Sequence, residues 1–345
     1  MKKMLLVLGV AAAAMTSCTS DEVLEMNPTN VIKFESFVNK GTRAVTETDA
    51  INFSQFYVFG YYKKDQTETK VFNNCYVRRT ADTHEETVDN IKNIWETDPS
   101  AVAMWTANTY YFGAYATKNE SDKIDNGVGF SDGKLSFTDY VVKDENDLVA
   151  AVKTVNNASL TNPYVDLTFK HLLSQVKFTF TNQYLNAGYT MHVSDITFSI
   201  KKQADCTYDG INITWGNTKG DNETISYAGT GDIANNIMVG ASYTSEAHLM
   251  IPQTIPTDVK ASFTITFYDT NNSVVDVLYF TGENSVSLIG NDQTTSVTEW
   301  QPGYIYNYKA DLPISPNAIK FTTSVESWLT TDVEDKEPGN EKIEF

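Results

Sequence analysis

The side chain with the clearest chemistry in this chain is the thiol of Cys18, because of what precedes it. Residues 2–3 are both lysine, residues 4–14 form an apolar run, and small residues lie directly before Cys18. This order predicts a secretory signal over residues 1–17, too short for a membrane span. It also predicts that the Cys18 thiol is diacylated and anchors the exported chain; an ordinary signal peptide with an incidental cysteine is the alternative.

A second candidate for chemistry is the peptide bond between Arg43 and Ala44. It lies in the short polar sequence Lys-Gly-Thr-Arg-Ala, residues 40–44. A flexible segment with one arginine predicts cleavage by a protease of trypsin-like specificity. Residues 18–43 would then be a propeptide that connects the lipid to the rest of the chain.

The propeptide itself contains a segment with the periodicity of a strand. In residues 30–39 (NVIKFESFVN), the side chains of Ile32, Phe34 and Val38 lie on one face, with Ser36 among them. Such alternation is typical of a half-buried strand and is too apolar for a free linker. The segment therefore predicts a strand that belongs to the fold before cleavage and leaves afterwards.

The sequence offers little for enzymatic chemistry. It has no Gly-x-Ser-x-Gly elbow, no Walker loop and no paired cysteines with zinc spacing. The acidic loops at residues 125–127 and 144–147 lack the EF-hand order, so solvated loops are expected there. The histidines are scattered along the chain, at His84, His171, His192 and His248. We therefore predict no catalytic activity, no bound metal and no cofactor.

Composition favours an exported β protein. The chain has 19 Tyr, 18 Phe and 5 Trp, residue types that suit pleated, half-buried surfaces. Its formal net charge of −18 argues against binding to nucleic acid or to anionic lipid. With Cys18 assigned to lipid, Cys75 and Cys206 remain. Because the domain boundary predicted near residue 165 separates them, two buried free thiols are expected, with a cross-domain disulfide as the alternative.

Short strands separated by turns predict the architecture. Strands are expected at residues 53–62, 109–117, 165–169, 173–182, 195–201 and 261–269, with turn-rich inserts at 119–133 and 216–231. A helix is expected near residues 141–155. This order predicts antiparallel β-sandwiches. A length of 345 residues allows an N-terminal domain over 44–165 and a C-terminal domain over 166–345.

The C-terminal region contains a second alternating segment, residues 317–329. Ile319, Phe321 and Val325 share one face, with Thr323 between them, a pattern similar to that of the propeptide strand. The segment could be a donor strand for another subunit or the last strand of its own domain. The acidic tail over residues 330–345 could be a flexible extension or a second donor.

Motifs along nearly the whole chain resemble those of the fimbrillins, the pilus subunits of Bacteroidales. They are the lipidation sequence, Thr-Arg-Ala at 42–44, Trp105 with YYFGAYA at 110–116, LTFKHLL at 167–173, MIPQ at 250–253, WQPGYIY at 300–306, IKF at 319–321 and VESW at 325–328. The acidic residues after Cys18 (Thr-Ser-Asp-Glu, 19–22) also resemble the surface-export tag of such lipoproteins; a solvated tether is the alternative.

The resemblance implies two tandem transthyretin-like β-sandwich domains with Greek-key topology. It also implies export to the outer membrane as a surface-exposed lipoprotein, cleavage after Arg43 by an arginine-specific protease, and assembly with other subunits into fimbriae by donor-strand exchange. An adhesive tip subunit, which has the same fold, is one alternative. A monomeric lipoprotein that binds a surface glycan or protein is another, and its candidate sugar-stacking residues are Trp95, Trp105 and Trp215.

Overall fold

The computed structural model describes residues 30–37, 55–64, 67–79, 95–118, 120–143, 146–156, 164–184, 188–227, 232–291, 296–312 and 321–328. This part of the chain is nearly all β, and its sheets are mostly antiparallel, which confirms the predicted fold class. Its helices are the short 3-10 turns η3 (Pro99–Ala101), η4 (Glu120–Asp122) and η5 (Gly282–Asn284). No helix in these ranges has the length and apolar character that crossing a membrane requires.

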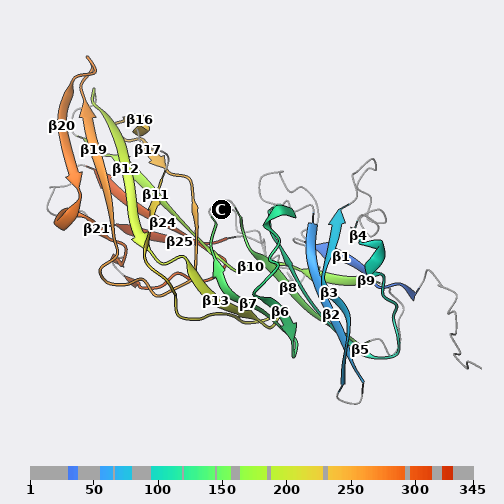
Figure 1. The fold of residues 1–345 in the computed structure, drawn as a ribbon. Helices are drawn as coiled ribbons and strands as arrows, with labels where there is room; N and C mark the ends of the chain where they lie inside the picture. Colours follow the sequence, from blue (N-terminus) through green and yellow to red (C-terminus); the bar gives the residue numbers. More distant parts are fainter. Residues whose placement is uncertain are drawn as a thin grey trace, which may run out of the picture.

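A six-stranded antiparallel sheet forms the centre of the N-terminal half (Figure 1). Its spatial order is β10 (Lys170–His171), β8 (Val149–Asn156), β5 (Thr109–Ala116), β2 (Gln55–Lys64), β3 (Thr67–Arg79) and β4 (Trp95–Thr97). The first seven residues of β2 are all buried. A strand buried on both faces needs apolar or aromatic side chains at successive positions, which explains the nearly continuous aromatic sequence of β2.

Two further layers bury the faces of this sheet. On one face lies the pair β1 (Lys33–Phe37) and β9 (Tyr164–Thr168). On the other lies a four-stranded sheet in the order β14 (Ile213–Trp215), β13 (Gln203–Tyr208), β7 (Lys134–Val141) and β6 (Val128–Ser131). The N-terminal half therefore has three layers and two separate cores.

Gly113 of β5 shows how closely two of these layers approach. A β-carbon at Gly113 would lie 2.4 Å from the nearest ring atom of Phe130, whereas one at Gly129 would meet nothing closer than 3.6 Å. We expect Gly113→Ala to lower the free energy of unfolding by about 1–3 kcal/mol, because overpacking must displace the ring or the strand. Urea denaturation measures this loss, with Gly129→Ala as the matched control. An equal loss in both variants would contradict the close approach.

The chain returns to the N-terminal half after it has left it. Strand β13 pairs with β7 in antiparallel register, with Cys206 opposite Phe137 and Tyr208 opposite Leu135. Residues 203–215 therefore share a sheet with residues 128–141. The domain boundary near residue 165 stays a prediction. Because β13 pairs with β7, no single boundary in the sequence assigns every strand of this sheet to one side.

The C-terminal half is a sandwich of two sheets. One contains β17 (Ser242–Thr244), β11 (Ser174–Asn182), β24 (Tyr304–Leu312) and β25 (Thr322–Ser327) in that order, with β18 (His248–Met250) also paired to β11. The other contains β15 (Glu223–Ser226), β12 (Thr190–Ile200), β19 (Lys260–Tyr268) and β20 (Val274–Phe280), with β16 (Asp232–Met238) on β12 and β21 (Val286–Ser287) on β19. A short pair, β22 (Gly290–Asn291) and β23 (Ser296–Val297), completes the strands.

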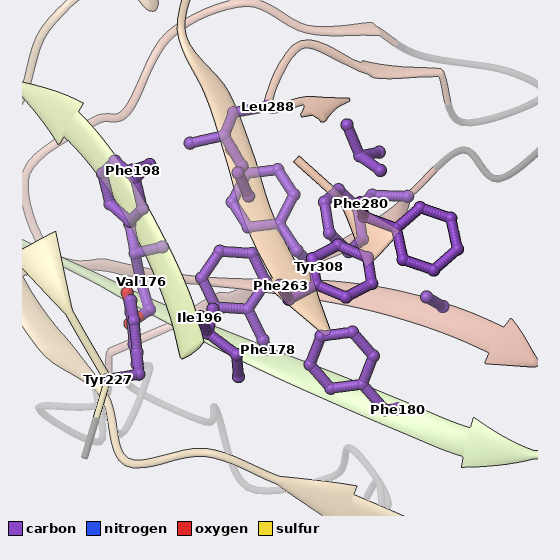
Figure 2. Packing of buried hydrophobic residues seen from close by; sticks show 14 of the residues in the cluster. Val176, Phe178, Phe180, Ile196, Phe198, Tyr227, Phe263, Phe280, Leu288 and Tyr308 are labelled. Carbon is purple, nitrogen blue, oxygen red and sulfur yellow. The ribbon is translucent and has the colours of Figure 1, made fainter. Parts of the chain in front are cut away.

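Aromatic side chains from both sheets fill the space between them (Figure 2). Phe178 and Phe180 alternate along β11, and the ring centroids of Phe180 and Phe263 of β19 are 5.0 Å apart. The alternating burial of β11 and β19 is the pattern of strands with one face in a core and one outside it. This sandwich therefore has the simple periodicity that the N-terminal sheet lacks.

Two local expectations require correction. The helix expected near residues 141–155 is wrong: residues 149–156 form β8, whose neighbours are β5 and β10. Its small buried residues Ala150 and Ala151 favour helices in isolation, but here they let two layers approach the sheet. Both Cys75 and Cys206 are free thiols, as expected. Cys206 is buried as predicted, but Cys75 is only half-buried. Burial raises the pKa of the Cys206 thiol.

Candidate functional site

The candidate site is the place where β1, the strand of the predicted propeptide, lies in the N-terminal half. β1 pairs along its length with β9 in parallel register, with Phe34 opposite Val165 and Ser36 opposite Leu167. Beside its start, the Ile32 amide donates to the Ala103 carbonyl at 2.9 Å. A segment that precedes the predicted cleavage bond thus contributes a strand to the described fold.

Phe34 is the central anchor of this strand. It is 1% exposed, and its ring makes edge-on contacts with Phe72, Phe112 and Phe56, at centroid distances of 5.3, 5.8 and 5.9 Å. Gly60 allows the Phe72 ring to pack close to the backbone of β2, because a β-carbon at residue 60 would lie 2.9 Å from that ring. We call the pocket around Phe34 and the adjoining site of Ile32 the β1 slot. Ile32 is also buried, so both described anchors fill the slot as predicted from their alternation.

A groove of about 710 Å³ adjoins the β1 slot. Residues 31–33, in the predicted propeptide, line this groove. Tyr76 and Arg78 of β3 and Trp95 and Glu96 of β4 line it as well. The groove and the β1 slot therefore share the Ile32 side chain.

The candidate donor segment lies in the other half of the molecule. Strand β25 pairs antiparallel with β24 and is the last strand in the order of its sheet. Phe321 is 1% exposed and lies among Phe178, Phe263 and Tyr308. Val325, predicted to share the buried face of Phe321, is 45% exposed. In this structure the segment is therefore the last strand of its own sandwich, and its described residues do not meet those of the β1 slot.

Trp328, just after β25, connects this strand to the N-terminal half. Its indole stacks on the ring of His171, with centroids 3.8 Å apart, and its amide donates to the Gly303 carbonyl at 2.7 Å. The His171 Nδ1 atom in turn lies 2.6 Å from the Asp147 carboxylate. His171 therefore packs between Trp328 and Asp147. The contact with Trp328 was not predicted, because nothing in the sequence relates residues 157 positions apart.

The remaining predicted positions divide into two groups. Cys18, Val38, Arg43, Ala44 and Ile319 lie outside the described residues. Among the tryptophans suggested for glycan binding, Trp105 is buried against Tyr110 and Phe112 and is unavailable for stacking on a sugar. Trp95 and Trp215 are half-buried and border grooves. The described ranges contain no group of three or more potential metal ligands.

Comparison with known proteins identifies the relatives of this fold. A family model described as fimbrillin-like matches residues 42–328. No curated protein matches the chain. A solved fimbrial protein from Bacteroides vulgatus aligns with 87% of this chain and 100% of its own, at 15% identity and a TM-score of 0.58. A Bacteroides uniformis structure, provisionally described as a cell adhesion protein, aligns with 87% and 98% of the two chains, at 15% identity and a TM-score of 0.48. Because the family model covers most of the sequence, this chain belongs to the fimbrillin-like family.

Proposed function

We propose that the chain is a structural pilus subunit that is lipidated on Cys18, cleaved after Arg43 and polymerised by donor-strand exchange. Membership of the family implies a location at the cell surface, association with other fimbrial subunits and a structural role. The lipid would hold the precursor in the outer membrane. Cleavage would release the subunit from its anchor and open the β1 slot in one step.

The observation that carries this proposal is the position of Ile32 and Phe34. Both side chains are buried in the core of the N-terminal half, yet both precede the predicted cleavage bond. Each buried apolar side chain contributes roughly 1.5–3 kcal/mol, so loss of the strand would leave a strongly unfavourable apolar slot. A strand from another subunit could fill it, with main-chain hydrogen bonds to β9 and alternate side chains in the pockets.

The proposed donor is residues 317–329 of the next subunit. β25 is the last strand in its sheet. To leave the sandwich it would have to break one described ladder, the one with β24. Contacts of this kind are head-to-tail and repeat without closing, which builds an open filament. If β25 remained in place, the same chain would serve at the tip of a fimbria, where no onward donor is needed.

The test is cleavage of the full-length precursor by an arginine-specific protease. We expect the mass of the product to match a chain that begins at Ala44. SDS-resistant ladders on gels and fibres in electron micrographs should then follow. The Arg43→Ala variant should remain lipidated and form no SDS-resistant ladder or fibre under the same conditions, because its slot stays filled. Normal fibres from that variant would contradict the proposal. Cleavage of the unaltered chain to a stable monomer would favour the tip subunit or the glycan-binding lipoprotein, which a glycan array then separates.

A further inference from the structure

Strand β20 is an edge strand whose ladder with β19 is regular from Asp276 to Phe280 and shifts register between Asp276 and Val274. It is the last strand in the order β15, β12, β19, β20, and Figure 1 shows it at the outer side of the C-terminal half. Its sequence, Val-Val-Asp-Val-Leu-Tyr-Phe, contains no lysine and no proline, and Asp276 is its single charge. Natural proteins usually protect an exposed edge with such residues, because its unpaired backbone groups are a template for another chain.

The side chains of β20 are unusually exposed for their apolar character. Val274, Val275 and Tyr279 are 57%, 40% and 64% exposed. Val274 also lies in one row across the sheet with Tyr268, Thr190 and Met238, and Met238 is 55% exposed. Met238 lies at the far end of this row, beyond the half-buried Tyr268 and Thr190. Exposed apolar side chains that gather on an edge strand favour an interaction site.

We propose that β20 pairs with β20 of a second copy of this chain, in antiparallel register about a twofold axis at Val277. This register overlaps residues 275–279 of both copies, with Val275 opposite Tyr279 of the copy. Pairs of a β-branched and an aromatic residue are among the favourable cross-strand pairs. The register also keeps Leu278 and Phe280, which face the core, on the same side of the joined sheet.

Charge supports this register over its neighbour. With the twofold axis at Val277, Asp276 lies opposite Leu278 of the copy, so the carboxylates of the two strands do not oppose each other. An axis at Asp276 would place them directly opposite, which is destabilising. An isologous contact of this kind uses the same patch on both copies and is closed. Because β20 and β25 belong to different sheets of the sandwich, the contact leaves the proposed donor strand free and would join fimbriae side by side.

The first experiment is sedimentation equilibrium of the uncut full-length chain in detergent, where strand exchange plays no part. We expect a reversible dimer that tightens between about 0.05 and 0.5 M salt, because each copy has a formal net charge of −18 that salt screens. The Val277→Lys variant should weaken the dimer about tenfold or more, since like charges then meet on the axis. The matched control is Val141→Lys, at a residue on β7 that is 43% exposed, and it should leave the dimer unchanged.

The second experiment tests the register with single cysteine substitutions that leave the fold intact. Val277→Cys should form an intermolecular disulfide under mild oxidation, because the two residues 277 meet on the axis. Val275→Cys should not, because its opposite residue is Tyr279. A chain that stays monomeric at all concentrations and salts, or that cross-links equally through both positions, would overturn the proposal. A dimer unaffected by Val277→Lys would do the same.

Discussion

Replacement of Phe34 by alanine should lower the free energy of unfolding of the uncut chain by about 3–5 kcal/mol. The ring is 1% exposed and lies among three phenylalanine rings of β2, β3 and β5, so its loss leaves a cavity as well as lost apolar contact. Urea denaturation of the full-length chain measures the change. The control is Ile211→Ala, which removes an apolar side chain that is 80% exposed and should cost less than about 0.5 kcal/mol.

The same substitution should change what happens after cleavage. Once the bond after Arg43 is cut, the propeptide is held only by non-covalent contacts, which include those of the Phe34 ring. The Phe34→Ala propeptide should therefore dissociate faster and allow earlier polymerisation, which a time course of SDS-resistant ladders records. Unchanged stability together with an unchanged time course would show that Phe34 does not hold the strand in the slot.

Alternation in the sequence singles out Ile32 and Phe34, and both side chains are buried. Ile32 and Phe34 differ sharply in polarity from Lys33 and Glu35, and this contrast is visible in the sequence. The same signal fails for β2, where both faces are buried. The aromatic run at 55–61 identifies a strand, but it does not reveal that two layers pack on it.

Local sequence patterns do not reveal which strands pair when the partners lie far apart in the sequence. The strands were expected to pair antiparallel, yet β1 pairs parallel with β9 and β11 with β24, each more than one hundred residues away. Local patterns specify that a segment is extended and which side is apolar, while the choice of neighbour depends on packing of the whole molecule. Val325 shows the same limit: its alternation with Phe321 gives the face of the strand, but not where the core ends.

Replacement of Phe321 by alanine should distinguish the two roles of β25, and its effect should be as large. In the monomer the Phe321 ring lies 5.4 Å from Phe178, 5.6 Å from Tyr308 and 5.9 Å from Phe263, so the substitution should cost about 3–5 kcal/mol of stability. If residues 317–329 are the donor strand, Phe321 leaves this core and enters the slot vacated by Phe34. The fibre then also depends on the ring.

The measurement is therefore resistance to urea of both the monomer and the assembled fibre, with Val325→Ala as the control on the same strand. A donor role predicts that Phe321→Ala weakens both the monomer and the fibre. The Phe321 ring would fill the core of its own sandwich before exchange and the β1 slot of the next subunit after it. A weakened monomer with fibres as resistant as those of the unaltered chain would exclude Phe321 as a donor anchor. β25 would then remain in its sandwich, held by its ladder with β24 and by the Trp328 indole stacked on His171.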